Sequence, residues 1–108
     1  MDWRNDFDSE ITRALQARQR GNEGQARVCA RRAAGIVARE FLGRRGSRSR
    51  SRSAIDLLEQ LRRQPGLPPL VLPLIDHLTQ RVDQSFQLPA EVDLVAEVRL
   101  LGSSLLKD

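Results

Sequence analysis

The chain has 108 residues, one cysteine and a formal net charge of +4 at pH 7. This length is enough for one domain with an ordinary hydrophobic core, and a single cysteine excludes an internal disulfide. Because no apolar run of about 18 residues is present and the first residues are too acidic for a signal or transit peptide, we expect a soluble, cytoplasmic domain over residues 1–108 with no membrane partner.

The first predicted helix covers residues 5–20, where Phe7, Ile11 and Ala14 follow helical spacing. Asn5 is the expected N-cap, with Trp3 folding back as a hydrophobic staple. The Gly and Asn residues at positions 21–24 end this helix, and so short a connection predicts an antiparallel neighbour.

Residues 24–42 are expected to form the central helix of the domain. Its broad apolar face consists of Ala26, Cys29, Ala30, Ala33, Ala34, Ile36, Val37 and Phe41. Because most of these side chains are small, neighbouring helices can approach near the short end of the usual interaxial range of about 8–10 Å. Among alanines, Cys29 is expected to act as a small hydrophobe rather than as a reactive thiol.

Residues 43–53 follow as a predicted flexible loop, because they include no apolar residue. The loop contains Arg44, Arg45, Arg48, Arg50 and Arg52. With no acid present it carries +5, which leaves −1 for the rest of the chain. These guanidinium groups are candidate phosphate contacts for nucleic acid, and the serines between them are candidate phosphorylation sites. The alternative is a solvated linker, which the scarcity of aromatic residues for base stacking favours.

The remaining sequence predicts three more helical segments. A capping-box pattern at residues 53–56 begins a short helix that ends near Gln64. Pro73 is expected to bend or delay the next helix, whose secure part covers residues 74–85. A last helix is expected from about Ala90 to Leu106. Since strand-like alternation is absent, the sequence predicts an all-α, antiparallel up-and-down bundle of four to five helices.

Two apolar sets are candidates for a homodimer interface. Val28, Gly35 and Leu42 recur at seven-residue spacing between arginines on the far side of the central helix. Flanking arginines can reach the rim of a two-fold interface and pair with acids there. The other set lies on the last two helices and consists of Leu70, Val71, Leu72, Leu100 and Leu106. The alternative is that both sets widen the core of a five-helix monomer.

The alanine-rich pattern from Ala26 to Leu42, followed by the Ser-Ala-Ile-Asp-Leu-Leu stretch at residues 53–58, resembles the HEPN superfamily of small helical-bundle proteins over nearly the whole chain. Active HEPN proteins are metal-independent ribonucleases in which an Arg stabilises charge on the phosphorus and a His about five residues away moves protons. Here Arg81 is kept but Phe86 stands at the His position. The resemblance therefore implies a non-catalytic binding module or a partner of a small nucleotidyltransferase.

The only histidine, His77, lies one turn before Arg81. A reversed His–Arg pair would make the protein a degenerate ribonuclease, whereas the simpler interpretation is a solvent-facing His paired with Asp76 or Arg81. One His and one Cys in different helices do not make a metal site, and no phosphate-cradling glycine motif indicates a cofactor. The leading hypothesis is a non-catalytic module that binds nucleic acid through the loop or binds a protein partner. A purely structural adaptor is the third hypothesis.

Overall fold

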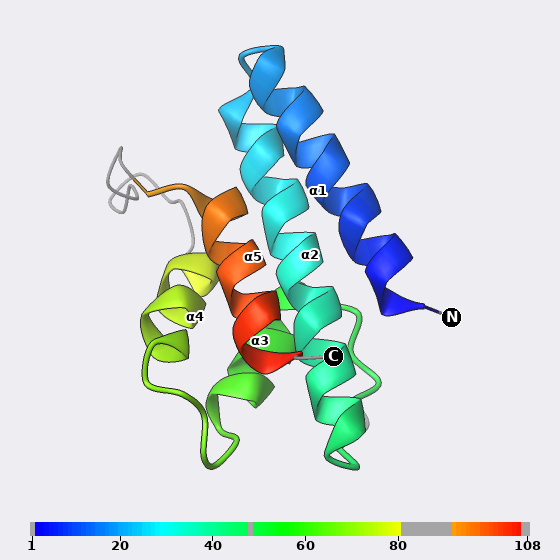
Figure 1. The fold of residues 1–108 in the computed structure, drawn as a ribbon, viewed down its shortest axis with the longest axis vertical. Coiled ribbons are helices and arrows are strands. Elements are labelled where there is room, and N and C mark those ends of the chain that lie inside the picture. The colour runs from blue at the N-terminus through cyan, green and yellow to red at the C-terminus, as the bar shows by residue number, and fades with distance from the viewer. Residues whose placement is uncertain (1, 48, 81–91, 107–108) are drawn as a thin grey trace.

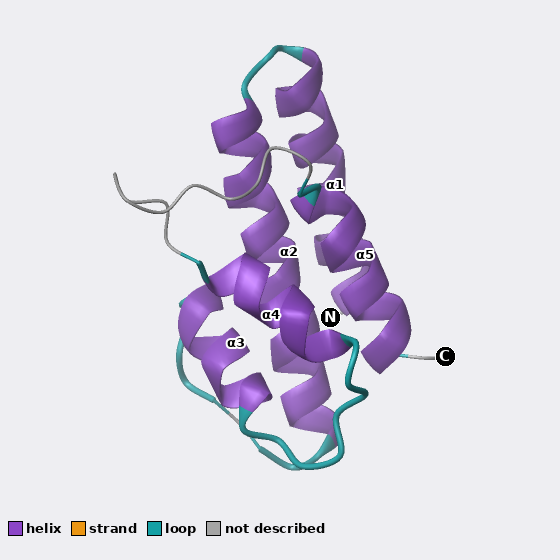
Figure 2. Cartoon of the chain, turned by 90° about the vertical axis from the view of Figure 1, so that its left-hand side faces the viewer, coloured by secondary structure: helices purple, strands orange, loops and turns teal. Residues whose placement is uncertain are grey.

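The computed structural model describes residues 2–47, 49–80 and 92–106, and in these ranges the chain forms five helices and no strand. The helices are α1 (Trp3–Gln19), α2 (Glu23–Arg44), α3 (Ala54–Arg62), α4 (Val71–Thr79) and α5 (Leu94–Leu105). The predicted all-α bundle is confirmed (Figure 2). None of the helices in the described ranges combines the length and the apolar character needed to cross a bilayer.

The start of α1 differs from the prediction. Asp2, not Asn5, is the N-cap, and its Oδ1 accepts a hydrogen bond of 2.9 Å from the backbone N–H of Arg4. Trp3 is therefore the first helical residue and not a staple outside the helix. Its ring contacts Phe7, one turn later, edge to face with 5.9 Å between ring centroids. The helix begins at this earlier cap because the Asp2 carboxylate accepts a hydrogen bond from an N–H group that has no helical carbonyl partner.

The helices α1 and α2 form a long antiparallel hairpin, as the short connection predicts (Figure 1). Gly21 adopts a φ of 76°, which side chains disfavour, and Asn22 caps α2 by accepting a hydrogen bond of 3.0 Å from the Gln25 backbone N–H. Small side chains, mostly alanines, are buried where the helices meet near this turn, so the two backbones can lie close together. Ala14, Ala17, Ala26 and Ala30 are fully buried there.

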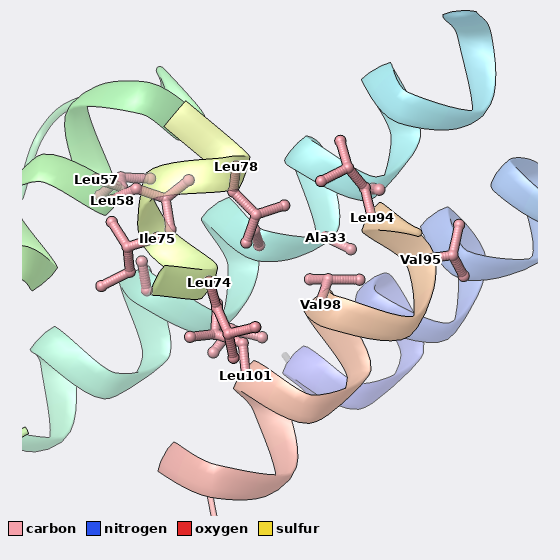
Figure 3. Packing of buried hydrophobic residues seen from close by; sticks show 14 of the residues in the cluster. Ala33, Leu57, Leu58, Leu74, Ile75, Leu78, Leu94, Val95, Val98 and Leu101 are labelled. Carbon is pink, nitrogen blue, oxygen red and sulfur yellow. The ribbon is translucent and has the colours of Figure 1, made fainter. Parts of the chain in front are cut away.

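The remaining helices pack against α2, which confirms its central place. Leucine, isoleucine and valine side chains of α3, α4 and α5 fill the space beside the alanine face of α2 (Figure 3). The helix α5 lies along α2 and runs in the same direction (Figure 1). At the end farthest from the hairpin turn, α3 packs against α2, and α4 packs against α3 and α5 (Figure 2). Cys29 is buried within this core, as predicted.

The close approach of α3 to α2 depends on a glycine. A Cβ atom at Gly35 would lie 2.9 Å from the Cβ atom of Ala54, the first residue of α3. Ser53 caps α3 as its sequence pattern predicts, since its Oγ accepts a hydrogen bond of 3.3 Å from the Asp56 backbone N–H. The start of α3 is therefore held directly against the middle of α2.

The helix α4 begins at Val71, ahead of the secure part that the sequence predicts from residue 74. Pro73 is tolerated because it lies in the first turn, where a backbone N–H has no helical acceptor. At the other end, the Arg31 guanidinium of α2 donates to the carbonyls of Leu78 and Gln80 at 3.2 and 3.3 Å. Burial, and then the charge of Arg27, lowers the pKa of Arg31 below its ordinary value. The predicted continuation of this helix to residue 85 lies outside the described residues.

The last helix begins at Leu94, because Asp93 caps it by accepting hydrogen bonds from the Val95 and Ala96 backbone N–H groups at 3.1 and 3.2 Å. The sequence prediction placed the start near Ala90, which lies outside the described residues. The helix starts at Leu94 instead, because Asp93 has extended backbone and caps it.

Candidate anion-binding surface

The predicted loop at residues 43–53 is divided between the end of α2 and an irregular segment. Arg44 belongs to α2 and forms an ion pair with Glu40 at 2.9 Å. Arg45 caps the helix, donates to the carbonyl of Pro65 at 2.7 Å and places its guanidinium 4.4 Å from the centre of the Phe41 ring. Arg45 therefore joins the end of α2 to the turn after α3, while Arg44 is paired within α2, and both are less available to a ligand than the sequence predicts.

The irregular segment is not the contact-free linker that its composition predicts, because its serines bind both neighbouring helices. The Gln60 side chain of α3 donates to Ser49 Oγ at 2.9 Å, and Ser51 Oγ donates to Asp56 at 3.1 Å. From α2, an Nη of Arg39 donates to the carbonyl of Ser51 at 2.9 Å. Short polar side chains can thus hold a segment without any apolar residue.

These contacts bring Arg52 beside two arginines of α2. The three guanidinium groups line a cavity of about 420 Å³, whose walls are Arg32, Gly35, Ile36, Arg39, Arg52, Ala54 and Leu57. We call it the arginine groove and define it by Arg32, Arg39 and Arg52. Its remaining wall is apolar and includes the partly buried Ile36. Because Ala54 is the first residue of α3, the positive end of that helix dipole also lies at the groove.

The charges of the arginine groove are not neutralised by ion pairs with the described part of the chain. Within the described residues none of Arg32, Arg39 and Arg52 forms an ion pair, and the hydrogen bond that Arg39 donates goes to the neutral carbonyl of Ser51. All three side chains belong to exposed residues. A cationic cavity with an apolar floor is a site for an anion that carries an apolar or planar part.

Sequence reasoning missed two of these three residues. It placed Arg32 and Arg39 on the far side of the central helix, beside the candidate dimer interface, and it named only Arg52 of the groove as a candidate contact. Of the other loop arginines, Arg50 is exposed, and Arg48 lies outside the described residues. The signal that could have found the groove is the spacing of seven from Arg32 to Arg39, which places both on one helical side.

His77 has a different partner from either residue that the sequence suggested. Its Nδ1 lies 2.7 and 2.9 Å from the two carboxylate oxygens of Glu97, so α4 and α5 are joined there. Asp76 instead pairs with Arg62 of α3. Arg81, the other suggested partner and the candidate catalytic arginine, lies outside the described residues together with Phe86. The His77–Glu97 contact could not be found from sequence because it joins two helices through their packing.

The homodimer interface that was predicted on the far side of α2 is not an exposed surface. Leu42 is 1% exposed and belongs to the core, and Gly35 is covered by Ala54 of the same chain, whereas Val28 is 38% exposed. Gly35 and Leu42 therefore pack within their own chain, whereas the prediction placed them against a second copy of it. Of the alternative set, Val71 and Leu106 are buried, and the exposed members are Leu70, Leu72 and Leu100.

No group of three potential metal ligands comes together in the described part of the chain. No protein-family model, curated protein or solved structure matches this sequence or its fold. The resemblance to the HEPN superfamily therefore stays a prediction, and the function has to be argued from the site itself.

Proposed function

We propose that this protein is a non-catalytic binding module that holds the phosphate groups of nucleic acid in the arginine groove. The observation that supports this proposal is the convergence of Arg32, Arg39 and Arg52 on one cavity without a carboxylate partner in the described residues. Three uncompensated guanidinium groups repel one another, so an anion that enters the groove is attracted by all three.

The chemistry of arginine suits phosphate better than it suits other anions of the same charge. A guanidinium group presents parallel N–H donors that match two phosphate oxygens, and it is more weakly hydrated than a lysine ammonium group. Contacts of this type position a nucleic acid but read no bases. We therefore expect binding that depends little on sequence and strongly on salt.

The test compares two triple variants in a fluorescence anisotropy titration with a labelled oligonucleotide. The variant Arg32→Gln, Arg39→Gln, Arg52→Gln removes the groove charges. The control variant Arg20→Gln, Arg63→Gln, Arg99→Gln removes the same net charge from exposed residues that do not line the groove. We expect the log–log salt slope to become shallower by about 2–3 in the groove variant, for three lost phosphate contacts, and by much less in the control. Equal losses in both variants would contradict the proposed site.

A second candidate function is ribonuclease activity, which the His77–Glu97 contact favours. In the neutral imidazole, a carboxylate that accepts a hydrogen bond from Nδ1 favours the tautomer whose Nε2 can accept a proton, as a general base must. If this histidine acts in catalysis, the protein should cleave mixed RNA in the presence of EDTA, and both His77→Ala and Glu97→Gln should lose at least about tenfold in rate. Absence of cleavage by the parent protein supports the non-catalytic proposal.

Protein partners remain part of the proposal, either a second copy of the chain or a nucleotidyltransferase-type protein. What supports an interface is the exposure of Leu70 and Leu72 around the start of α4 and of Leu100 on α5. Light scattering at micromolar concentration measures the state of the parent and of a Leu72→Ser, Leu100→Ser variant. A monomeric parent would contradict the predicted homodimer.

A further inference from the structure

We propose that the arginine groove selects a terminal phosphate, that is, a phosphate monoester at the end of a nucleic-acid strand, over the internal diesters. This inference rests on the proposed function, because it specifies which phosphate the same site holds. It is carried by a second set of residues, on the α1 side of the groove, whose charge is opposite to that of the arginines.

The cavity does not continue along a uniformly positive surface. An adjoining hollow shares Arg32 and Ile36 with the groove, and its other walls are Asp6, Ser9, Glu10 and Arg13 of α1. Another shares Ile36 and Arg39 and is completed by Trp3, Asp6 and Glu40. We call Asp6, Glu10 and Glu40 the acidic rim. The groove is thus bounded on its α1 side by carboxylates.

The members of the acidic rim differ in how far their charge is compensated. Glu10 pairs with Arg13 at 3.0 Å and Glu40 pairs with Arg44 at 2.9 Å, so these carboxylates are largely neutralised. Asp6 is exposed and has no ion pair within the described residues. The negative charge next to the groove is therefore concentrated on Asp6, which lines both adjoining hollows.

An internal stretch of a strand fits this arrangement poorly. A phosphate diester in the groove is followed by further phosphates in both directions, and a strand that runs toward α1 brings one of them against Asp6. Like charges that come close together repel. Among the described residues that line the two hollows, Arg13 is already paired with Glu10, and the unpaired guanidinium groups are those of Arg32 and Arg39, which the phosphate in the groove engages. A strand that ends in the groove avoids the repulsion, because it extends in one direction only.

The charge of the groove also matches a monoester better than a diester. A terminal phosphate carries about −1.5 to −2 at pH 7 and offers three oxygens as acceptors, whereas an internal diester carries a single charge. Three guanidinium groups around one cavity supply donors for all three oxygens. The same match holds for a free phosphate monoester, so the test separates the end of a strand from a small molecule.

The experiment uses single-stranded RNA dodecamers that are identical except for their ends, with a fluorophore placed at the opposite end. We expect a 5′- or 3′-phosphate to tighten Kd about tenfold over the matching hydroxyl end, the change that one charge-assisted hydrogen bond supplies. Inorganic phosphate and ribose 5-phosphate are added as competitors. A monoester site is supported if millimolar ribose 5-phosphate displaces a phosphorylated strand and chloride of the same ionic strength does not. The inference is overturned if ribose 5-phosphate displaces nothing and strands with phosphate and hydroxyl ends bind with equal Kd.

A matched pair of variants tests the role of the acidic rim. Asp6→Asn should tighten binding of the hydroxyl-ended strand and reduce the preference for a terminal phosphate, because the repulsion is removed while the charge match with the arginines stays. Asp8→Asn removes the same charge from an exposed residue of α1 that does not line either hollow and should leave the preference unchanged. A preference that Asp6→Asn leaves intact overturns the rim argument.

The outcomes distinguish this inference from the function on which it rests. If the parent protein binds all dodecamers equally and the groove variant binds none, the proposed function holds and the terminal-phosphate inference is wrong. If the parent protein binds no dodecamer at any end, the proposed function itself fails.

Discussion

Arg18 in α1 and the arginines of the groove show two opposite uses of the same residue type. Arg18 donates to Glu23 at 3.0 Å and to Asp93 at 3.1 Å, so it joins the hairpin to the start of α5. Hydrogen bonds to Glu23 and to Asp93 raise the pKa of Arg18 above its ordinary value. In the groove, by contrast, none of Arg32, Arg39 and Arg52 forms an ion pair with a described carboxylate.

The difference indicates which arginines stabilise the fold and which are available to a ligand. A paired arginine satisfies its donors within the chain, so a change there affects stability. An arginine with unpaired donors contributes little to the folded state, so a change there affects binding. The following variants sharpen this distinction, in order of decreasing expected effect on the free energy of unfolding.

The largest effect is expected for Gly35→Ala, which tests the close approach of α3 that forms one wall of the groove. The added methyl group would meet both Cβ and Cα of Ala54, at 2.9 and 3.0 Å, so the helices have to move apart. Overpacking of this kind costs about 1–3 kcal/mol, which exceeds the gain of about 0.5–1 kcal/mol from replacing a helical glycine.

Gly43→Ala is the matched control for that variant. Gly43 also lies in α2, but a Cβ atom there meets nothing within 4 Å. We expect it to stabilise the protein by about 0.5–1 kcal/mol. Chemical denaturation measures both, and a Gly35→Ala variant as stable as Gly43→Ala would mean that α2 and α3 are not in tight contact.

An intermediate effect is expected for Asp93→Ala, which removes the cap of α5 and one partner of Arg18. The loss should be about 1 kcal/mol at pH 7. Burial alone would raise the pKa of Asp93, but the Ala96 N–H and the Arg18 guanidinium outweigh it and lower that pKa below its ordinary value of 3.8. The stabilisation is therefore complete above the unfolded pKa and is lost as the pH falls through the folded one. Denaturation at pH 7 and well below pH 3.8 should show the variant and the parent converging in acid.

The smallest effects on the free energy of unfolding are expected for single arginine variants. Here a change at Arg18 should affect stability, and a change in the groove should affect binding. Arg18→Gln should cost at most about 1 kcal/mol, because its ion pairs are partly exposed. Arg52→Gln should leave the melting temperature unchanged and weaken oligonucleotide binding instead. If Arg52→Gln lowers the melting temperature more than Arg18→Gln, the division into structural and available arginines is wrong.

Much of the fold could be predicted from the sequence, because helices and their buried faces depend on local spacing. The alanine-rich face of α2, the burial of Cys29 and the cap at Ser53 follow from the period of 3.6 residues and from N-cap chemistry. The errors lie at helix starts, where one carboxylate such as Asp2 or Asp93 decides the first residue.

The candidate site was decided by the tertiary structure. Sequence spacing places Arg32 and Arg39 on one side of a helix, but it does not show that the segment before α3 lies against that side. That contact results from the missing side chain of Gly35 and from the hydrogen bonds of Ser49 and Ser51, which are not periodic. The same limit applies to His77 and Glu97, whose contact depends on how two helices cross. Local periodicity determines which faces are buried, whereas only the packing of the helices determines which exposed side chains become neighbours.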